Sequence, residues 1–257
     1  MRGTIAAMTS VPQFELLTRE CERMASLTHD DLALPILSMP DWTVEKLIRH
    51  VSFVHRMAVA ALETPASEGM AKVVGAVAKP ERGPQVLDDY RESAARMLAA
   101  YRAVDPTQEV ATWAGIVSAD YWIRRQLHEV TVHRFDAQDA IHECGGPEPE
   151  SADPVGAADA IVEWAEQFLT RFPVEKVPAV AGRTVHLHTD DGTDAELFLD
   201  FTGDEVAVSR LHRKGDVALR GSAQNLMLTL WRRRPLDGLD IVGDRAVAQA
   251  LYDGIRI

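Results

Sequence analysis

The spacing at which apolar residues recur changes near residue 183, and this change constrains the fold more than any other feature of the sequence. Before it, apolar residues recur three or four positions apart, which is the period of an amphipathic helix. After it, apolar and polar residues alternate, as in the segment TVHLHT at 184–189. The pattern therefore predicts a helical domain at residues 1–174 and a smaller α+β domain at residues 183–257.

Four long helices are expected in the first domain, at residues 11–27, 43–62, 86–101 and 119–144. Thr43 and Ser118 stand where the second and fourth helices begin, and their hydroxyl groups can accept hydrogen bonds from the first turn. Gly145 follows the fourth helix and indicates its end. A fifth amphipathic helix is predicted to end before Pro173, and residues 174–183 are typical of a linker.

The second domain begins with three alternating segments, TVHLHT, AELFLDF and EVAVSRL, which are joined by the turn sequences DDGT and TGD. They predict a three-stranded meander. Two further strands are expected in VALRG and DIVGD. Ser222 is a suitable cap for a helix that continues to Trp231, and a last helix is expected in RAVAQALYDG.

The chain carries 27 basic and 39 acidic residues, a formal net charge of -12. Its average field repels nucleic acid and anionic lipid, so neither a nucleic acid nor a membrane is expected as a partner. Cys21 and Cys144 are too far apart in the sequence to indicate a thiolate zinc motif. The apolar run near the N-terminus is too short for a signal peptide, which favours a cytoplasmic location.

An unusual number of ionisable residues gathers in the segment RRQLHEVTVHRFD, at residues 124–136. On a helix that turns about 100° per residue, Glu129 and His133 lie one turn apart on the same face and can share one metal ion. His128 diverges from His133 by about 140°, so the segment is not the HExxH motif of zinc proteases. The spacing predicts a metal-binding pair that needs a third ligand from another segment.

The residues alone leave two alternatives open. The polar stripe of this helix can line a metal site, or it can be a solvent-exposed face held by salt bridges. The stripe comprises Trp122, Arg125, Gln126, Glu129, His133 and Asp136. The third ligand can be His50 or His55, which flank opposite borders of the apolar stripe on the second predicted helix.

Two segments together, MPDWTVEKLIRHVSFVHR and WIRRQLHEVTVHRFDAQDA, resemble the mycothiol-dependent maleylpyruvate isomerase family. The resemblance spans nearly the whole chain and implies an N-terminal DinB-type four-helix bundle. It implies that the Trp-Thr-x-x-x-Leu-x-x-His string at residues 42–50 supplies a zinc ligand, His50. The His-Glu-x-x-x-His-Arg-x-Asp string implies Glu129 and His133 as the other two ligands, with Asp136 or Gln126 orienting His133.

The C-terminal segment ALRGSAQNLMLTLWRRRP is similar to the second domain of the same family, which resembles sterol-carrier folds. The family carries a functional arginine after this Leu-rich helix. Three arginines follow here, and the resemblance favours Arg233 as the catalytic residue over Arg232 and Arg234. Alternatively, the three arginines form a basic turn at the C-terminal end of the helix and complement the helix dipole.

The resemblance implies zinc and mycothiol as cofactors of a monomer or homodimer. Three protein ligands leave a fourth zinc position for a thiol, which zinc deprotonates for addition to an electrophilic small molecule. The outcome would be cis-trans isomerisation or S-transfer. The alternative is a small-molecule or lipid-binding protein with a structural or vestigial metal site. His186 and His188 have a spacing that can bind metal, but we expect them to be exposed strand residues.

Overall fold

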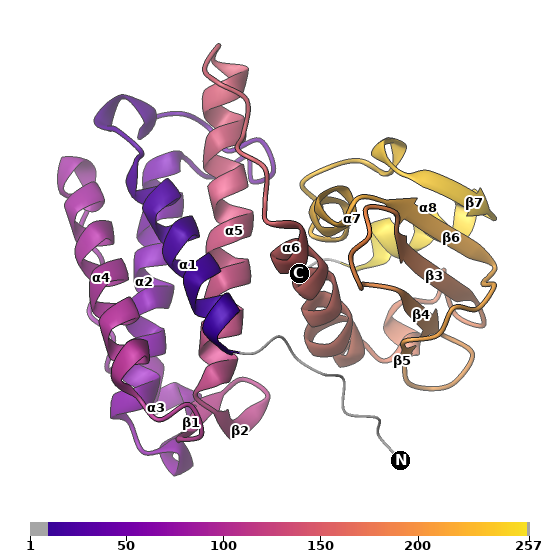
Figure 1. Ribbon diagram of the computed structural model, residues 1–257, viewed down its shortest axis with the longest axis horizontal. Helices are drawn as coiled ribbons and strands as arrows, with labels where there is room; N and C mark the ends of the chain where they lie inside the picture. Colours follow the sequence, from indigo (N-terminus) through magenta and orange to yellow (C-terminus); the bar gives the residue numbers. More distant parts are fainter. Residues whose placement is uncertain (1–9, 256–257) are drawn as a thin grey trace. The chain divides into compact units, whose positions relative to one another are not determined.

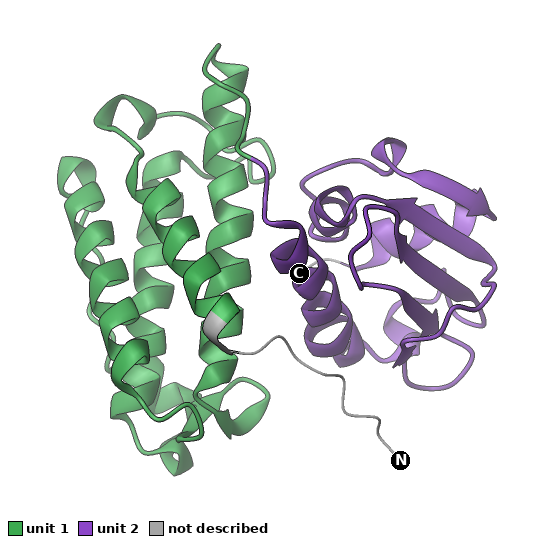
Figure 2. Cartoon of the chain, in the orientation of Figure 1, with its two compact units in different colours: residues 1–150 green, residues 151–257 purple. Residues whose placement is uncertain are grey.

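The computed structural model describes residues 10–255 and divides after Glu150 into two units (Figure 2). The first unit is helical and the second contains a sheet, which confirms the predicted fold class (Figure 1). Residues 1–9, which include much of the segment considered as an export signal, lie outside the described residues. No helix in the described part of the chain is both long and apolar enough to cross a membrane.

The four predicted helices of the first unit are present. They are α1 (Ser10–Ala25), α2 (Val44–Glu63), α4 (Val86–Ala103) and α5 (Asp120–Glu143). A short helix, α3 (Gly69–Gly75), and a hairpin of β1 (Glu109–Thr112) and β2 (Gly115–Ser118) were not predicted. Both are short and lie in segments rich in glycine and turn-forming residues, where apolar spacing carries little information.

Helix α5 is central to the bundle, because both α1 and α2 pack against it. Its apolar residues Leu127 and Val130 belong to the core, together with Leu17 of α1 and Leu47 of α2. Helix α4 packs against α2 on the other side. This packing leaves little of α5 exposed to solvent, and many of its polar residues therefore lie inside the bundle.

The helix ends match the sequence in part. The Thr43 hydroxyl accepts a hydrogen bond from the Lys46 amide at 3.4 Å and caps α2 as predicted. Gly145, with φ of 90°, follows the end of α5 as predicted. The prediction for Ser118 is wrong: this residue closes strand β2, where it pairs with Glu109, so its backbone is committed to the hairpin and Ala119 occupies the cap position of α5.

The sheet of the second unit has the strand order β5-β4-β3-β6-β7. Its strands are β3 (Thr184–Thr189), β4 (Leu197–Asp200), β5 (Ala207–Ser209), β6 (Val217–Gly221) and β7 (Asp240–Gly243). The predicted meander of β3, β4 and β5 is confirmed, and β6 lies parallel to β3 on its other side. Two helices complete the fold as predicted, α7 (Ala223–Leu230) and α8 (Arg245–Gly254), and the Ser222 hydroxyl caps α7.

Helix α6 (Pro154–Glu163) belongs to the second unit, whereas the change of period had placed it in a first domain ending at residue 174. The reason is packing, since α6 lies against α7, and its Ile161 is fully buried. The segment 174–183, which resembled a linker, is likewise part of this unit. Its Gly182 amide donates a hydrogen bond to the Phe201 carbonyl at 2.8 Å, directly after strand β4.

Candidate metal centre

Three side chains from two helices of the first unit converge. His50 of α2 and Glu129 of α5 approach to 2.8 Å between Nε2 and Oε1. His133, one turn along α5, places its own Nε2 3.3 Å from the same carboxylate oxygen. The ligand atoms of the three residues all lie within 4.8 Å of one another, and the two imidazole rings are 5.1 Å apart. We call this group the helical cluster.

The other candidate histidine of α2 does not join this cluster. His55 is fully buried, and its ring lies 5.4 Å from the ring of Tyr90. Neither ring nitrogen has a hydrogen-bond partner among the described residues, and burial lowers the pKa of His55 to about 3. Five residues turn a helix by about 140°, so His55 cannot share the direction of His50.

His133 is held by a chain of hydrogen bonds on its other side. Its Nδ1 lies 2.9 Å from Oδ2 of Asp136, whose side chain is almost fully buried. The Ser38 hydroxyl, from the loop before α2, donates to Oδ1 of Asp136 at 2.6 Å. A carboxylate on Nδ1 favours the tautomer with its proton there, which leaves the Nε2 lone pair directed at the cluster. The Gln126 amide has no hydrogen-bond partner among the described residues, so it does not share this task.

The charges around Glu129 keep it ionised. Burial raises the pKa of Glu129, but hydrogen bonds from His133 and His50 and the charge of Arg125 hold it well below its usual range. Arg125 reaches the second carboxylate oxygen at 2.7 Å. Burial lowers the pKa of His133, but Asp136 and Glu129 outweigh it and raise that pKa to about 9. A metal ion would take the place of this proton, since histidine binds metals as the neutral imidazole.

The donor set fits a zinc ion. Two imidazole nitrogens and one carboxylate oxygen form a familiar zinc set that leaves one position for a further ligand. The exposed fraction of the side chain is 36% for His50 but 10% for His133, so the cluster opens on the His50 side. Trp42 lies edge-on to His50 there, with ring centroids 5.2 Å apart.

The interpretation of the polar stripe of α5 as a solvent-exposed face is wrong. Trp122, Gln126 and Asp136 each expose 2% of their surface or less. Neighbouring helices cover α5 on both sides, and a periodic pattern cannot reveal this because polar and apolar stripes look the same whether or not another helix covers them. The stripe is the interior wall that carries Glu129 and His133.

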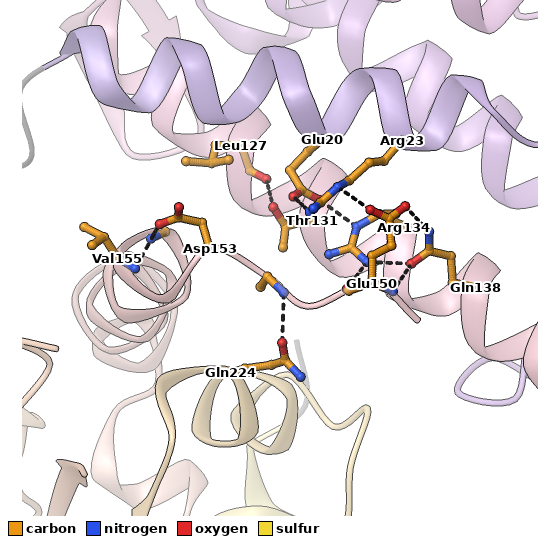
Figure 3. Close-up of polar contacts among 12 residues, drawn as sticks. Glu20, Arg23, Leu127, Thr131, Arg134, Gln138, Glu150, Asp153, Val155 and Gln224 are labelled. Carbon is orange, nitrogen blue, oxygen red and sulfur yellow. Dashed lines mark hydrogen bonds and ion pairs between the residues drawn. The ribbon is translucent and has the colours of Figure 1, made fainter. Parts of the chain in front are cut away.

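A second network, between α1 and α5, fixes the rotation of α5 (Figure 3). The guanidinium of Arg134 is buried and contacts Oε2 of Glu20 on α1 at 2.6 Å. It also donates to Oε1 of Gln138 and to the carbonyl of Glu150, each at 2.6 Å. Because Arg134 follows His133 directly, this anchoring turns His133 and Glu129 toward α2.

The three arginines after α7 have different surroundings within the second unit. Arg232 adopts a positive φ of 64°, and its guanidinium lies 4.5 Å from the Tyr252 ring and donates to the Tyr252 carbonyl. Arg233 is half-buried and donates to the Trp231 carbonyl at 2.8 Å. Arg234 donates to the Arg233 carbonyl at 2.9 Å. Arg232 is thus engaged by α8, and the role predicted for Arg233 stays a prediction.

One expectation about the sheet is wrong. His186 was expected to be exposed, but its side chain is 9% exposed and it meets three other potential ligands, His188, Glu196 and His212. Strand alternation alone could have placed His186 and His188 on one face. The contributions of Glu196 and His212 depend on how the strands pair.

Comparisons with known proteins identify the family of both units. The family model described as the mycothiol maleylpyruvate isomerase N-terminal domain matches residues 15–138, and the model of the C-terminal domain of the same family matches residues 156–250. No curated protein sequence matches the chain.

The solved structures that share the fold include the following two. One is a histidine-to-alanine mutant of the mycothiol-dependent maleylpyruvate isomerase, with a TM-score of 0.63 and 14% sequence identity. The other is the mycothiol-dependent maleylpyruvate isomerase itself, with a TM-score of 0.56 and 15% identity. Each alignment covers 91% of this chain and 93% of the other chain. At this identity the likeness shows the fold.

Proposed function

Because the chain belongs to the mycothiol-dependent maleylpyruvate isomerase family, we propose that it is a zinc- and mycothiol-dependent enzyme that isomerises a small cis-enedioic keto acid such as maleylpyruvate. The observation that carries this proposal is the convergence of His50, Glu129 and His133 from two helices. Three protein ligands suit catalysis because they leave one zinc position for a ligand from solution.

The chain's own residues prepare this position. Asp136 and Ser38 hold His133 with its Nε2 lone pair toward the cluster. Arg125 keeps the Glu129 carboxylate in place through its second oxygen. When bound, zinc and mycothiol supply a thiolate at neutral pH, a nucleophile that can add reversibly to an activated double bond.

The substrate carboxylates require a cationic partner, and we assign this role to Arg233. The resemblance of the segment after α7 to the C-terminal domain of the family favours Arg233 over Arg232 and Arg234. An arginine pairs with a carboxylate through two parallel hydrogen bonds and stabilises negative charge that develops during the reaction. Arg233→Lys would keep the charge and lose the paired geometry, so it separates these two contributions.

The test is a comparison of two glutamate variants of the same helix. Glu129→Gln is expected to lose the zinc of the helical cluster and to lower mycothiol-dependent isomerisation by at least about 100-fold. Loss of a residue that only hydrogen-bonds to a metal ligand costs about 10–100-fold in affinity or activity, and loss of a ligand itself should cost more. Glu143→Gln, at the exposed C-terminal end of α5, is the matched control and should retain both.

Analysis of the products distinguishes the outcomes. A trans isomer with mycothiol regenerated supports the isomerase, whereas a stable thioether with an alkylating substrate assigns the same site to S-transfer. Zinc-loaded protein that turns over no enedioic keto acid with mycothiol overturns the proposal. Equal activity of Glu129→Gln and the unaltered protein would remove the helical cluster from catalysis.

A further inference from the structure

Three histidines and one glutamate of the second unit meet away from the helical cluster, and the proposed function uses none of them. His186 and His188 lie on β3, Glu196 directly precedes β4, and His212 lies in the segment 210–216 between β5 and β6. Their ligand atoms all lie within 4.8 Å of one another. Within residues 10–255, they and the helical cluster are the two groups of potential metal ligands that gather this closely. We call these four residues the sheet cluster.

The strand pairing produces this group. Alternation along β3 places His186 and His188 on the face opposite Val185 and Leu187, which are fully buried. Leu187 pairs with Leu197 of β4 in antiparallel register, and one residue further the same register sets His188 opposite Glu196. The connection from β5 to β6 then brings His212 to this face.

The three histidines of the sheet cluster converge on one carboxylate oxygen. A single carboxylate oxygen, Oε1 of Glu196, lies 3.0 Å from Nε2 of His186 and 2.9 Å from Nδ1 of His188, and it also contacts Nδ1 of His212. An oxygen of this kind has two lone pairs, so three donors exceed what it can accept well. The ring centroids are 5.4 to 5.9 Å apart. One cation among the four side chains would satisfy all of them.

We propose that His186, His188, Glu196 and His212 bind a divalent transition-metal ion, with zinc as the expected occupant. Three imidazoles and one carboxylate are poor ligands for calcium or magnesium, which prefer oxygen alone. They suit zinc and its neighbours in the first transition row. Four protein ligands complete a tetrahedral zinc shell, so this site is structural, unlike the helical cluster.

A hollow and an irregular segment of the chain lie beside the sheet cluster. A hollow of about 380 Å³ borders the three histidines and is lined further by Arg213, Lys214, Arg220 and other residues. It gives ions access from solvent, and the carboxylate of Asp216 also belongs to its lining. The side chain of His212 is 77% exposed, and the segment that carries it has no regular secondary structure. A bound ion would fasten this segment to β3.

The experiment measures zinc binding to full-length protein without a histidine tag, after removal of metal with a chelator. Glu129→Gln serves as the background because it removes the helical cluster, and His50→Ala is the substitute background if that variant does not fold. We expect two zinc ions per chain in the unaltered protein and one in the background, with a micromolar or lower Kd by calorimetry. Adding His212→Ala or Glu196→Gln should weaken binding of the remaining zinc ion by more than about 100-fold. This exceeds the effect of losing a residue that only hydrogen-bonds to a metal ligand.

His142→Ala, an exposed histidine at the end of α5, is the matched control and should not alter zinc binding. Amide hydrogen exchange gives an independent readout. Zinc should slow exchange in residues 210–216 of the background protein and have no effect there once His212 is alanine. A folded background protein that binds no stoichiometric zinc overturns the proposal, as does zinc binding that His212→Ala and Glu196→Gln leave unchanged. Neither result depends on turnover, so the proposed function is tested separately.

Discussion

The helical cluster and the sheet cluster use the same two kinds of ligand, but they are built differently. The helical cluster has three potential ligands on two long helices, and the sheet cluster has four potential ligands on one strand and its neighbouring loops. Asp136 and Arg125 brace the first from behind, whereas the second includes His212, whose side chain is 77% exposed. The number of potential ligands is the basis of the two proposed roles, because three protein ligands leave a zinc position for chemistry and four close the shell.

The largest expected effect comes from removing one histidine of each cluster. His133→Ala should abolish zinc binding at the helical cluster and lower thiol-dependent turnover by at least about 1,000-fold, or about 4 kcal/mol in activation free energy. His188→Ala should leave one zinc per chain, held by the helical cluster. Elemental analysis and turnover measured on the same samples test the comparison. If His133→Ala keeps its activity while His188→Ala loses it, the roles of the two clusters are reversed.

The second prediction concerns the ion pair of Arg134 and Glu20, which anchors α5 and so supports the helical cluster. Glu20→Gln leaves the buried guanidinium of Arg134 without its ion-pair partner, which should lower the free energy of unfolding by about 3 kcal/mol. Glu22→Gln, an exposed neighbour on α1, is the control and should stay within about 0.5 kcal/mol of the unaltered protein. Urea denaturation measures both. Equal stability of the two variants would show that the Arg134 network does not anchor α5.

The third prediction concerns Asp136, which hydrogen-bonds to His133 of the helical cluster and, among the described residues, has no counterpart in the proposed sheet cluster. Asp136→Asn keeps the shape of the side chain but removes the charge that orients His133 and raises its basicity. Zinc affinity of the helical cluster should fall by about 10–100-fold, with little change at the sheet cluster. Asp139→Asn on the same helix is the matched control. Calorimetry in a His212→Ala background isolates the relevant ion, and an unchanged Kd would argue against a bracing role.

The smallest expected effect concerns acid stability of the helical unit. His55 is neutral when folded, with a pKa lowered to about 3 by burial, whereas the unfolded chain binds a proton near the ordinary value of 6.5. Its contribution is therefore complete above pH 6.5 and is lost as pH falls toward 3, by about 1.4 kcal/mol per pH unit. His55→Leu should lose about 1 kcal/mol less stability than the unaltered protein between pH 7 and pH 5.5. Parallel losses in both proteins would contradict this assignment.

The fold could be predicted from the sequence where an element is long and its apolar residues recur regularly. The four long helices and the meander satisfied this condition. The hairpin at 109–118 and the short helix α3 did not, because each strand or turn is only a few residues long. The placement of α6 could not be predicted, since its apolar stripe fits a helical bundle as well as the helices beside a sheet. Ser118 was wrongly predicted to be a helix cap because serine is common both in hairpins and at helix caps.

The sequence by itself determined that Glu129 and His133 share one face of a helix, because helical periodicity depends only on residues a turn apart. It also determined that His186 and His188 share one face of a strand. Only the tertiary structure decided that His50 and not His55 completes the helical cluster, and that Glu196 and His212 join the two strand histidines. The physical reason is that local periodicity orients a side chain about its own element, whereas the distance between two elements depends on which surfaces pack together.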